Sequence, residues 1–183
     1  MKKILFLVGL LFTVATASAQ AVLDKGGLQL NGKLGISGWG VPVAIGVDYG
    51  ITPEITVGGE LSARFYNTTG YKFVEEDFGY GVKVRRAKPT DFTHSIFGIF
   101  ANGNYHFHKL FKLPSKVDVY AGASLGFFVA SNPSGYEGSS FSGFGWGIQT
   151  GGRYFFTDKF GVLLEIGGGL VGHEIKAGVT YKL

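Results

Sequence analysis

The sequence predicts an all-β fold, an eight-stranded antiparallel up-and-down transmembrane β-barrel. Apolar and polar residues alternate with a period of two in eight segments, which is the spacing of strands. The chain is 45% hydrophobic, yet after its first residues it holds no run of about 20 apolar residues, the length that a membrane helix needs. The first and last segments alternate alike, so they can pair and leave no open sheet edge.

The eight segments follow one another in chain order. The first sets Leu28, Leu30, Leu34 and Ile36 against Gln29, Asn31 and Lys33. The last alternates up to Leu183, with Ile175, Val179 and Tyr181 on its apolar side. Glycine and proline turns or polar loops separate the segments. The other six predicted strands cover 41–49, 55–66, 93–107, 117–129, 144–156 and 162–170, and the last covers 174–183.

The N-terminus predicts export. Lys2 and Lys3 precede an apolar run over 4–14, and small residues lead to Ala19. This is the pattern of a secretory signal peptide over 1–19, read by the Sec pathway and cleaved after Ala19. Residues 20–183 then form one barrel domain.

Charge and cysteine content exclude some classes of function. Without the two signal lysines, 15 basic residues face 13 acidic ones, so the sequence gives no case for nucleic-acid binding. The sequence has no cysteine, so the exported chain holds together without disulfides. No pattern points to a cofactor.

The connections alternate in length. The links 50–54, 108–116 and 157–160 lie on the side of both termini, whereas 67–91 and 130–143, on the other side, are longer. Outer-membrane barrels have short periplasmic turns and longer outside loops. The long pair is therefore expected outside the cell, and aromatic residues at the strand ends, among them Tyr49, Trp39 and Phe92, are expected to form two girdles.

Several motifs resemble those of a known family. They are Ala17 to Gln20, Tyr49 to Thr52 followed by Val57 to Glu60, Asn104 to Phe107, and Asp118 to Gly122. The mature chain resembles the small outer-membrane barrels of the OmpX and OmpA-transmembrane type, in the porin-like "outer membrane beta-barrel" family common in Bacteroidetes. The resemblance implies an outer-membrane location, contact with lipid and lipopolysaccharide, and assembly by a β-barrel insertase. The closing residues look like the insertase signal, with Leu where Phe is usual: Lys176, Gly178, Tyr181 and Leu183.

Two groups of residues are candidate functional sites. Eight charges fall on the predicted inward face, and because isolated buried ions are costly we expect them to pair. Asp118 is expected to pair with Arg153, Glu165 with Lys176, and Glu60 with Lys33 or Arg64. The network consists of Lys33, Asp48, Glu60, Arg64, Asp118, Arg153, Glu165 and Lys176. The loop 67–91 is the other site, and it carries Tyr71, Phe73, Glu75, Glu76, Asp77, Lys83, Arg85, Arg86 and Lys88.

The alternating pattern also fits other folds and functions. A lipocalin-like carrier would put the apolar face inside. The four histidines are scattered, and His106 and His108, which could bind a metal, more simply belong to a solvated turn. We therefore expect no catalytic or metal site. The favoured function is a structural or interaction barrel with a plugged polar interior, whose long loop docks an extracellular protein or rests on lipopolysaccharide. A narrow channel for small or hydrophobic solutes comes second and an enzyme third.

Overall fold

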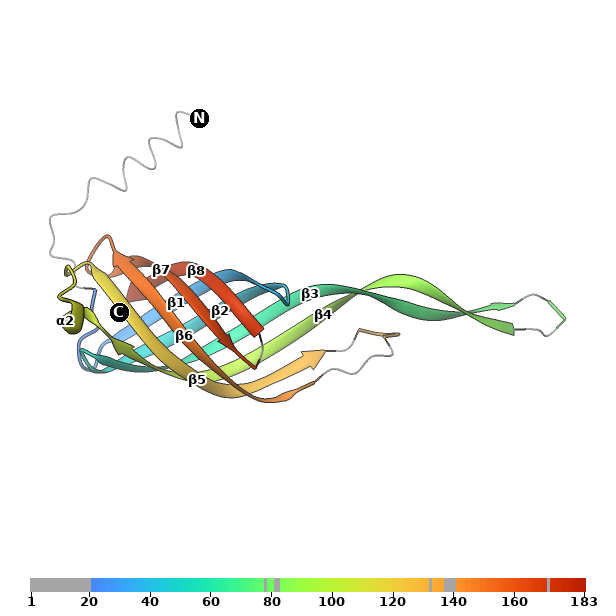
Figure 1. The fold of residues 1–183 in the computed structure, drawn as a ribbon, viewed down its shortest axis with the longest axis horizontal. Helices are drawn as coiled ribbons and strands as arrows, with labels where there is room; N and C mark the ends of the chain where they lie inside the picture. The colour runs from blue at the N-terminus through green and yellow to red at the C-terminus, as the bar shows by residue number, and fades with distance from the viewer. Residues whose placement is uncertain (1–20, 78, 81–82, 132, 137–140, 171) are drawn as a thin grey trace, which may run out of the picture.

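A computed structural model describes residues 21–77, 79–80, 83–131, 133–136, 141–170 and 172–183. The predicted signal peptide, 1–19, lies outside the described residues. The described part contains eight strands and one short helix (Figure 1). They are β1 Leu28–Ser37, β2 Val41–Thr52, β3 Ile55–Asp77, β4 Lys83–His106, α2 His108–Phe111, β5 Val117–Ser131, β6 Gly143–Phe155, β7 Phe160–Gly169 and β8 Gly172–Lys182.

The strands close into a barrel, which confirms the predicted fold class. Each strand pairs antiparallel with the next in sequence, and β1 pairs with β8 from Gln29↔Lys182 to Ser37↔Glu174. The first-to-last pairing leaves the wall without a free edge. An eight-stranded barrel has an interior just wide enough for side chains to fill, so the identity of those side chains decides what the lumen can do.

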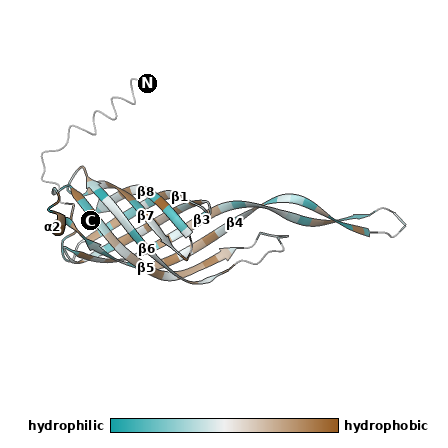
Figure 2. Cartoon of the chain, in the orientation of Figure 1, coloured by the Kyte–Doolittle hydropathy of each residue, from teal (hydrophilic) through white to brown (hydrophobic). Residues whose placement is uncertain are grey.

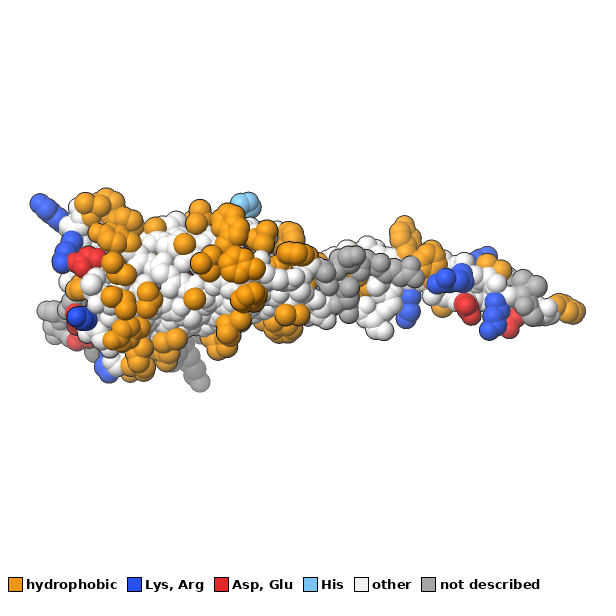
Figure 3. Space-filling view, turned by 90° about the horizontal axis from the view of Figure 1, so that it is seen from below, with side chains coloured by type: hydrophobic (Ala, Val, Ile, Leu, Met, Phe, Trp, Pro, Cys, Tyr) orange, Lys and Arg blue, Asp and Glu red, His pale blue; other side chains and the backbone are white. Residues whose placement is uncertain are grey.

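The wall is apolar outside and polar inside. Leu34, Ile45 and Ile148 point outward and are about 60% exposed, whereas Lys33 and Glu165 point inward and are nearly buried. Figure 3 shows hydrophobic side chains over the visible face of the barrel wall, and Figure 2 shows hydrophobic and hydrophilic positions interspersed along the strands. This arrangement is the opposite of a lipocalin-like carrier, so that alternative is wrong.

The segment that precedes β1 lies across one mouth of the barrel, on the side of both termini. Ala21, Val22 and Leu23 are buried there. The Ala21 N–H donates to the Ser115 carbonyl over 2.5 Å, and the Lys182 Nζ donates to the Val22 carbonyl over 2.8 Å. The backbone passes so close to β2 that a Cβ on Gly50 would lie 2.2 Å from the Asp24 carbonyl oxygen.

The predicted loop 67–91 is instead mostly strand, which corrects the sequence analysis. β3 and β4 remain paired from Ile55↔Tyr105 to Asp77↔Lys83. Pairing of β3 with β2 ends at Phe65, and pairing of β4 with β5 ends at Ser95. Residues 67–77 and 83–93 therefore form a two-stranded extension, here called the ribbon, which continues the long axis of the barrel (Figure 1).

Phe92 lies at the base of the ribbon and does not belong to a lipid-facing girdle. Its side chain is buried, and its ring packs against Tyr136 with centroids 5.3 Å apart. His94 stacks on Tyr66 and meets the edge of the same Tyr136 ring. Tyr136, in the described part of the β5–β6 connection, thus packs against the base of the ribbon. Tyr49 on β2 and Trp39 in the β1–β2 turn are exposed as expected.

Candidate functional site

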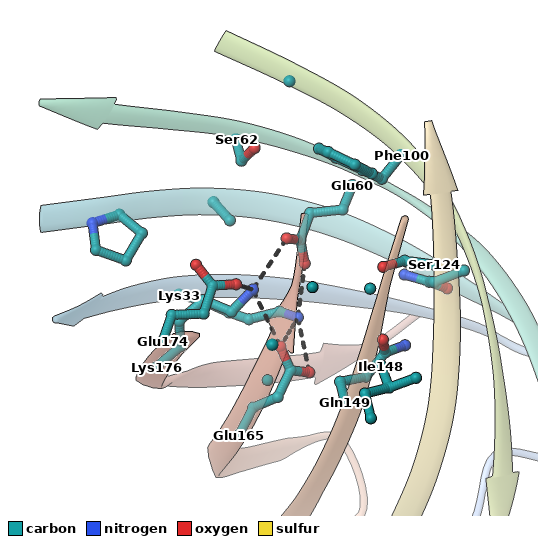
Figure 4. Close-up of a pocket in the computed structure, with 18 of the residues that line it drawn as sticks. Lys33, Glu60, Ser62, Phe100, Ser124, Ile148, Gln149, Glu165, Glu174 and Lys176 are labelled. Carbon is teal, nitrogen blue, oxygen red and sulfur yellow. Dashed lines mark hydrogen bonds and ion pairs between the residues drawn. The ribbon is translucent and has the colours of Figure 1, made fainter. Parts of the chain in front are cut away.

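A four-residue ion cluster occupies the middle of the lumen. The Lys33 Nζ lies 2.6 Å from a Glu60 oxygen and 2.9 Å from Glu165. The Lys176 Nζ lies 3.1 Å from each of the same two carboxylates. Figure 4 shows the two ammonium groups held between the two acids. The four side chains come from β1, β3, β7 and β8, so the cluster joins strands across the lumen as well as neighbours in the wall.

A second cluster lies nearer the termini. The Arg153 guanidinium lies 2.7 Å from Asp48 and 3.4 Å from Asp118, and all three side chains are at least 96% buried. Asn31 donates to Asp48 over 2.9 Å. Buried charges are tolerated only when they are paired and hydrogen-bonded, which these contacts provide.

Tyr120 connects the two clusters, and the sequence analysis did not single it out. Its hydroxyl donates to Glu165 over 2.8 Å, and the Arg153 guanidinium lies 4.4 Å from its ring centroid. Tyr120 could have been recognised from its place on the polar face of a predicted strand, because a buried Tyr hydroxyl requires a hydrogen-bond partner.

The outermost pair differs from the expectation for Arg64. Its guanidinium lies 2.6 Å from Glu174, which the sequence analysis left out of the network, and not against Glu60. Glu174 also forms an ion pair with Lys176, whose Nζ lies 2.7 Å from the carboxylate. Glu60 is instead saturated by Lys33 and Lys176. The other suggested pairs, Asp118 with Arg153 and Glu165 with Lys176, are present.

His106 lies inside the barrel and not in a solvated turn. Its Nδ1 is 2.9 Å from Asp118, and its Nε2 is 3.0 Å from the Thr56 hydroxyl. Hydroxyl, imidazole and carboxylate stand in the order that acyl-transfer enzymes use. All three side chains are at most 2% exposed, so a substrate cannot reach the hydroxyl while the barrel is closed. The set therefore acts as a structural hydrogen-bond chain.

The described residues contain no group of three His, Cys, Asp or Glu side chains that could hold a metal ion. His106 points into the lumen, whereas His108 begins α2 at the rim. Both ring nitrogens of His106 are engaged by Asp118 and Thr56, so neither is left for a metal ion shared with His108.

A cavity of about 90 Å³ runs beside the ion clusters. Its walls include Phe100, Asn102, Ser124 and Gln149, on the side of the lumen opposite β1 and β8 (Figure 4). The Asn102 Oδ1 is buried there without a hydrogen-bond partner among the described atoms. One water needs roughly 10–15 Å³ of such space, so the cavity has room for several ordered waters.

Helix α2 is tied to the neighbouring turn at the rim. Lys109 forms an ion pair with Glu54, which lies in the β2–β3 turn. The hydrogen bond from Lys109 lowers the pKa of the Glu54 carboxyl. This contact lies at the solvated end of the barrel, so it orients the connection and takes no part in the lumen.

The ribbon carries the nine candidate residues of the predicted loop in two alternating sets. Tyr71, Phe73, Glu75 and Asp77 share one face with Pro89, Ala87, Arg85 and Lys83, their cross-strand partners. This face is called the Tyr71 face. The opposite one, the Lys72 face, carries Lys72, Val74 and Glu76 with Lys88, Arg86 and Val84.

The predicted insertase residues lie in or just after β8. Lys176 points into the lumen, and Tyr181 and Leu183 point outward with 43% and 64% exposure. Gly178 lies where β8 approaches β1, and a Cβ at this position would be 2.0 Å from the Gly32 carbonyl oxygen. Gly178 therefore has a steric role in the seam that is independent of any recognition signal.

Comparison with known sequences identifies one family. A family described as "Outer membrane protein beta-barrel domain" matches residues 7–182. No curated protein matches the sequence significantly.

Solved structures with a similar fold are small barrels. Outer membrane protein OprG from Pseudomonas aeruginosa is 11% identical with a TM-score of 0.55, covering 90% of this chain and 99% of that one. Neisserial surface protein A is 21% identical with a TM-score of 0.54, covering 86% and 95%. Ail from Yersinia pestis, solved in a phospholipid bilayer nanodisc, is 12% identical with a TM-score of 0.51, covering 87% and 100%. At these identities the likeness concerns the fold alone.

Proposed function

The chain belongs to the outer membrane protein beta-barrel family, and we propose that it is a structural and interaction protein that displays the ribbon outside the cell. The protein is accordingly an outer-membrane protein. The observation that carries the proposal is the contrast between a lumen filled by paired side chains and a ribbon that no other strand pairs with beyond Phe65 and Ser95. A protein built to conduct would need the reverse in its lumen, a continuous water-filled interior.

The ribbon has the composition of a binding surface. Tyr71 and Phe73 are 63% and 45% exposed, and the Arg85 guanidinium lies 5.1 Å from the Phe73 ring centroid. Aromatic residues and arginine are the side chains most enriched at protein interfaces. A protein partner therefore fits this surface better than lipopolysaccharide, whose phosphates would select basic residues alone.

The lumen in this proposal is closed. The segment over 21–27 covers the mouth near the termini, and the ion clusters bridge the lumen above it. A narrow channel is the second candidate, favoured by the cavity of about 90 Å³ beside those clusters. An enzymatic role is not proposed, because the Thr56 hydroxyl is sealed inside the barrel.

Export and assembly complete the proposal. We propose that residues 1–19 direct export through the Sec pathway and are removed, which leaves 20–183 as the barrel domain. The insertase would read the C-terminal pattern, and the outward positions of Tyr181 and Leu183 support its accessibility. Lipid and lipopolysaccharide would then surround the apolar wall.

Two measurements test the proposal. The purified protein in a planar bilayer is expected to give no steady single-channel current, and steady currents would favour the channel. Vesicles bearing the protein, or a variant lacking 71–88, are then compared for adherence to surfaces coated with extracellular-matrix protein. Adherence that depends on the ribbon supports display, and equal behaviour of the two vesicles contradicts it.

A further inference from the structure

The Tyr71 face of the ribbon is an apolar surface without a core behind it. A two-stranded ribbon in water is at best marginally stable by itself. Here Tyr71 and Phe73 stand opposite Pro89 and Ala87 in the register, and all four are exposed. Figure 3 shows hydrophobic side chains part-way along the ribbon and both signs of charge nearer its tip. This patch lies beyond the apolar wall, so bilayer lipid does not cover it.

The charges of the Tyr71 face are separated by strand. Its acids, Glu75 and Asp77, are on β3, and its bases, Arg85 and Lys83, are on β4. The register puts Glu75 level with Arg85 and Asp77 level with Lys83. Within the chain, Lys83 and Glu75 are 3.9 Å apart and more than 60% exposed, so their ion pair contributes little to the stability of the ribbon.

This separation is self-complementary under a two-fold axis. Two barrels in one membrane stand upright, so an axis that relates them runs along the membrane normal, the direction in which the ribbon continues the barrel (Figure 1). When two Tyr71 faces meet about that axis, β3 of each copy faces β4 of the other at equal height. Glu75 then faces Arg85 of the second copy, Asp77 faces Lys83, and Phe73 packs over Ala87.

The opposite face does not have this property. On the Lys72 face, Lys72 stands level with Lys88, and Val74 stands level with Arg86. The same rotation would therefore set lysine against lysine and an apolar residue against arginine. The ribbon also twists (Figure 1), so two copies can face each other only over a short stretch. The stretch 71–77 with 83–89 combines the apolar residues with acids on one strand and bases on the other.

We propose that the Tyr71 face binds the Tyr71 face of a second copy of this chain in the same membrane. The apolar residues form the buried centre of the contact, and the two acid-base rows set its orientation. Sheets packed face to face lie about 10 Å apart, a distance that aromatic side chains opposite proline and alanine can fill. This inference rests on the proposed function, in which the ribbon is the interaction element, and it names the partner.

Charge reversal tests the proposal, because two opposite reversals are expected to restore the dimer that each one alone weakens. In the variant E75K/D77K both rows are basic, and in K83E/R85E both are acidic. Each variant alone is expected to dimerise at least tenfold more weakly than the parent in lipid nanodiscs or detergent, measured by light scattering and analytical ultracentrifugation. An equal mixture of the two is expected to form mixed dimers, and the fourfold variant E75K/D77K/K83E/R85E is expected to dimerise like the parent.

Two controls separate the contact from folding. The variant K72E changes the charge of the Lys72 face and is expected to leave the dimer unchanged, while heat-modifiable gel mobility reports whether each barrel is folded. The chain has no cysteine, so F73C on one chain and A87C on a differently tagged chain allow a short bismaleimide to link the two copies. We expect the crosslinked product to contain both tags.

Several results would overturn the inference. A parent that stays monomeric at high density in lipid, a dimer that survives both charge reversals, or a mixture that restores nothing each contradicts it. Contact only between separate vesicles would contradict the shared membrane. If the parent is monomeric and ribbon deletion still abolishes adherence to a coated surface, the proposed function stands and only the self-pairing fails.

Discussion

The lumen and the ribbon use the same acids and bases with different consequences. The Lys33–Glu60 pair is 2.6 Å long with side chains 7% and 12% exposed, whereas the Lys83–Glu75 pair is 3.9 Å long with both side chains above 60%. An exposed pair gains little because water and salt screen it, while removing one partner of a buried pair leaves a charge that nothing compensates. Burial, and not residue type, decides which charges hold the barrel and which remain available for recognition.

Arg153→Met gives the largest expected effect. The substitution keeps much of the volume and strands Asp48 and Asp118, so we expect a loss of about 3–5 kcal/mol in the free energy of unfolding. Urea unfolding in lipid vesicles, followed by gel mobility, measures it. Arg85→Met on the ribbon is the matched control and should change stability by about 0.5 kcal/mol or less. Equal effects of the two substitutions would break the comparison.

Glu60→Gln tests a single member of the middle cluster. The amide leaves Lys33 and Lys176 with one carboxylate fewer, and we expect a cost of about 2–3 kcal/mol without any conductance. Glu76→Gln, whose carboxylate lies 3.6 Å from Arg86 and 3.4 Å from Lys88 on the ribbon, should cost about 0–1 kcal/mol. A Glu60→Gln protein as stable as its parent, or one that conducts, would contradict the plugged lumen.

Gly178→Ala separates steric closure from recognition. The added methyl would press on the Gly32 backbone at the β1–β8 seam, and we expect a loss of about 1–2 kcal/mol. Gly32→Ala is the control, because its Cβ would meet only Val179 at 3.8 Å. The same unfolding assay on protein refolded without the insertase makes the comparison. Unchanged stability of Gly178→Ala would show that the seam can relax.

Deletion of 71–88 gives the smallest expected effect on the barrel. The removed ribbon pairs with no wall strand, so the free energy of unfolding should stay within about 0.5 kcal/mol of the parent value. Heat-modifiable mobility and outer-membrane yield measure it. A barrel that fails to assemble would show that the ribbon supports strands β3 and β4 within the wall.

Sequence reasoning succeeded where one face is buried and failed where neither is. In the wall, the alternation of Leu28, Leu30 and Leu34 with polar residues identifies the strand and the inward side of Lys33. Along the ribbon both faces are solvated, so the hydrophobic period disappears and 67–91 is indistinguishable from a loop. Tyr71, Phe73 and Val74 favour strands, but that preference is weak without the period.

Partners across the lumen were harder to predict than partners along the wall. Asp118 and Arg153 are level in the register of adjacent strands, as are Glu165 and Lys176, so neighbouring strands suffice to suggest them. Arg64 and Glu174 are 110 residues apart and belong to strands that do not touch. Their contact depends on strand tilt and stagger, which fix how side chains meet across a barrel and are not written in the local pattern.

The connection of Lys33 to Glu165, 132 residues later in the chain, has a consequence for the order of assembly. Until β1 meets β8, Lys33 lacks Glu165 and Glu60 lacks Lys176, so each end of the chain holds ion pairs that are only partly compensated. Carrying such pairs into hydrocarbon one hairpin at a time would cost free energy that the closed barrel does not lose. Insertion of the strands should therefore be cooperative and coincide with closure of the β1–β8 seam, with a high contact order and no stable half-inserted sheet. Time-resolved refolding into vesicles should accordingly show Trp39 and Trp146 entering the bilayer in the same kinetic phase, although they stand on opposite halves of the sequence.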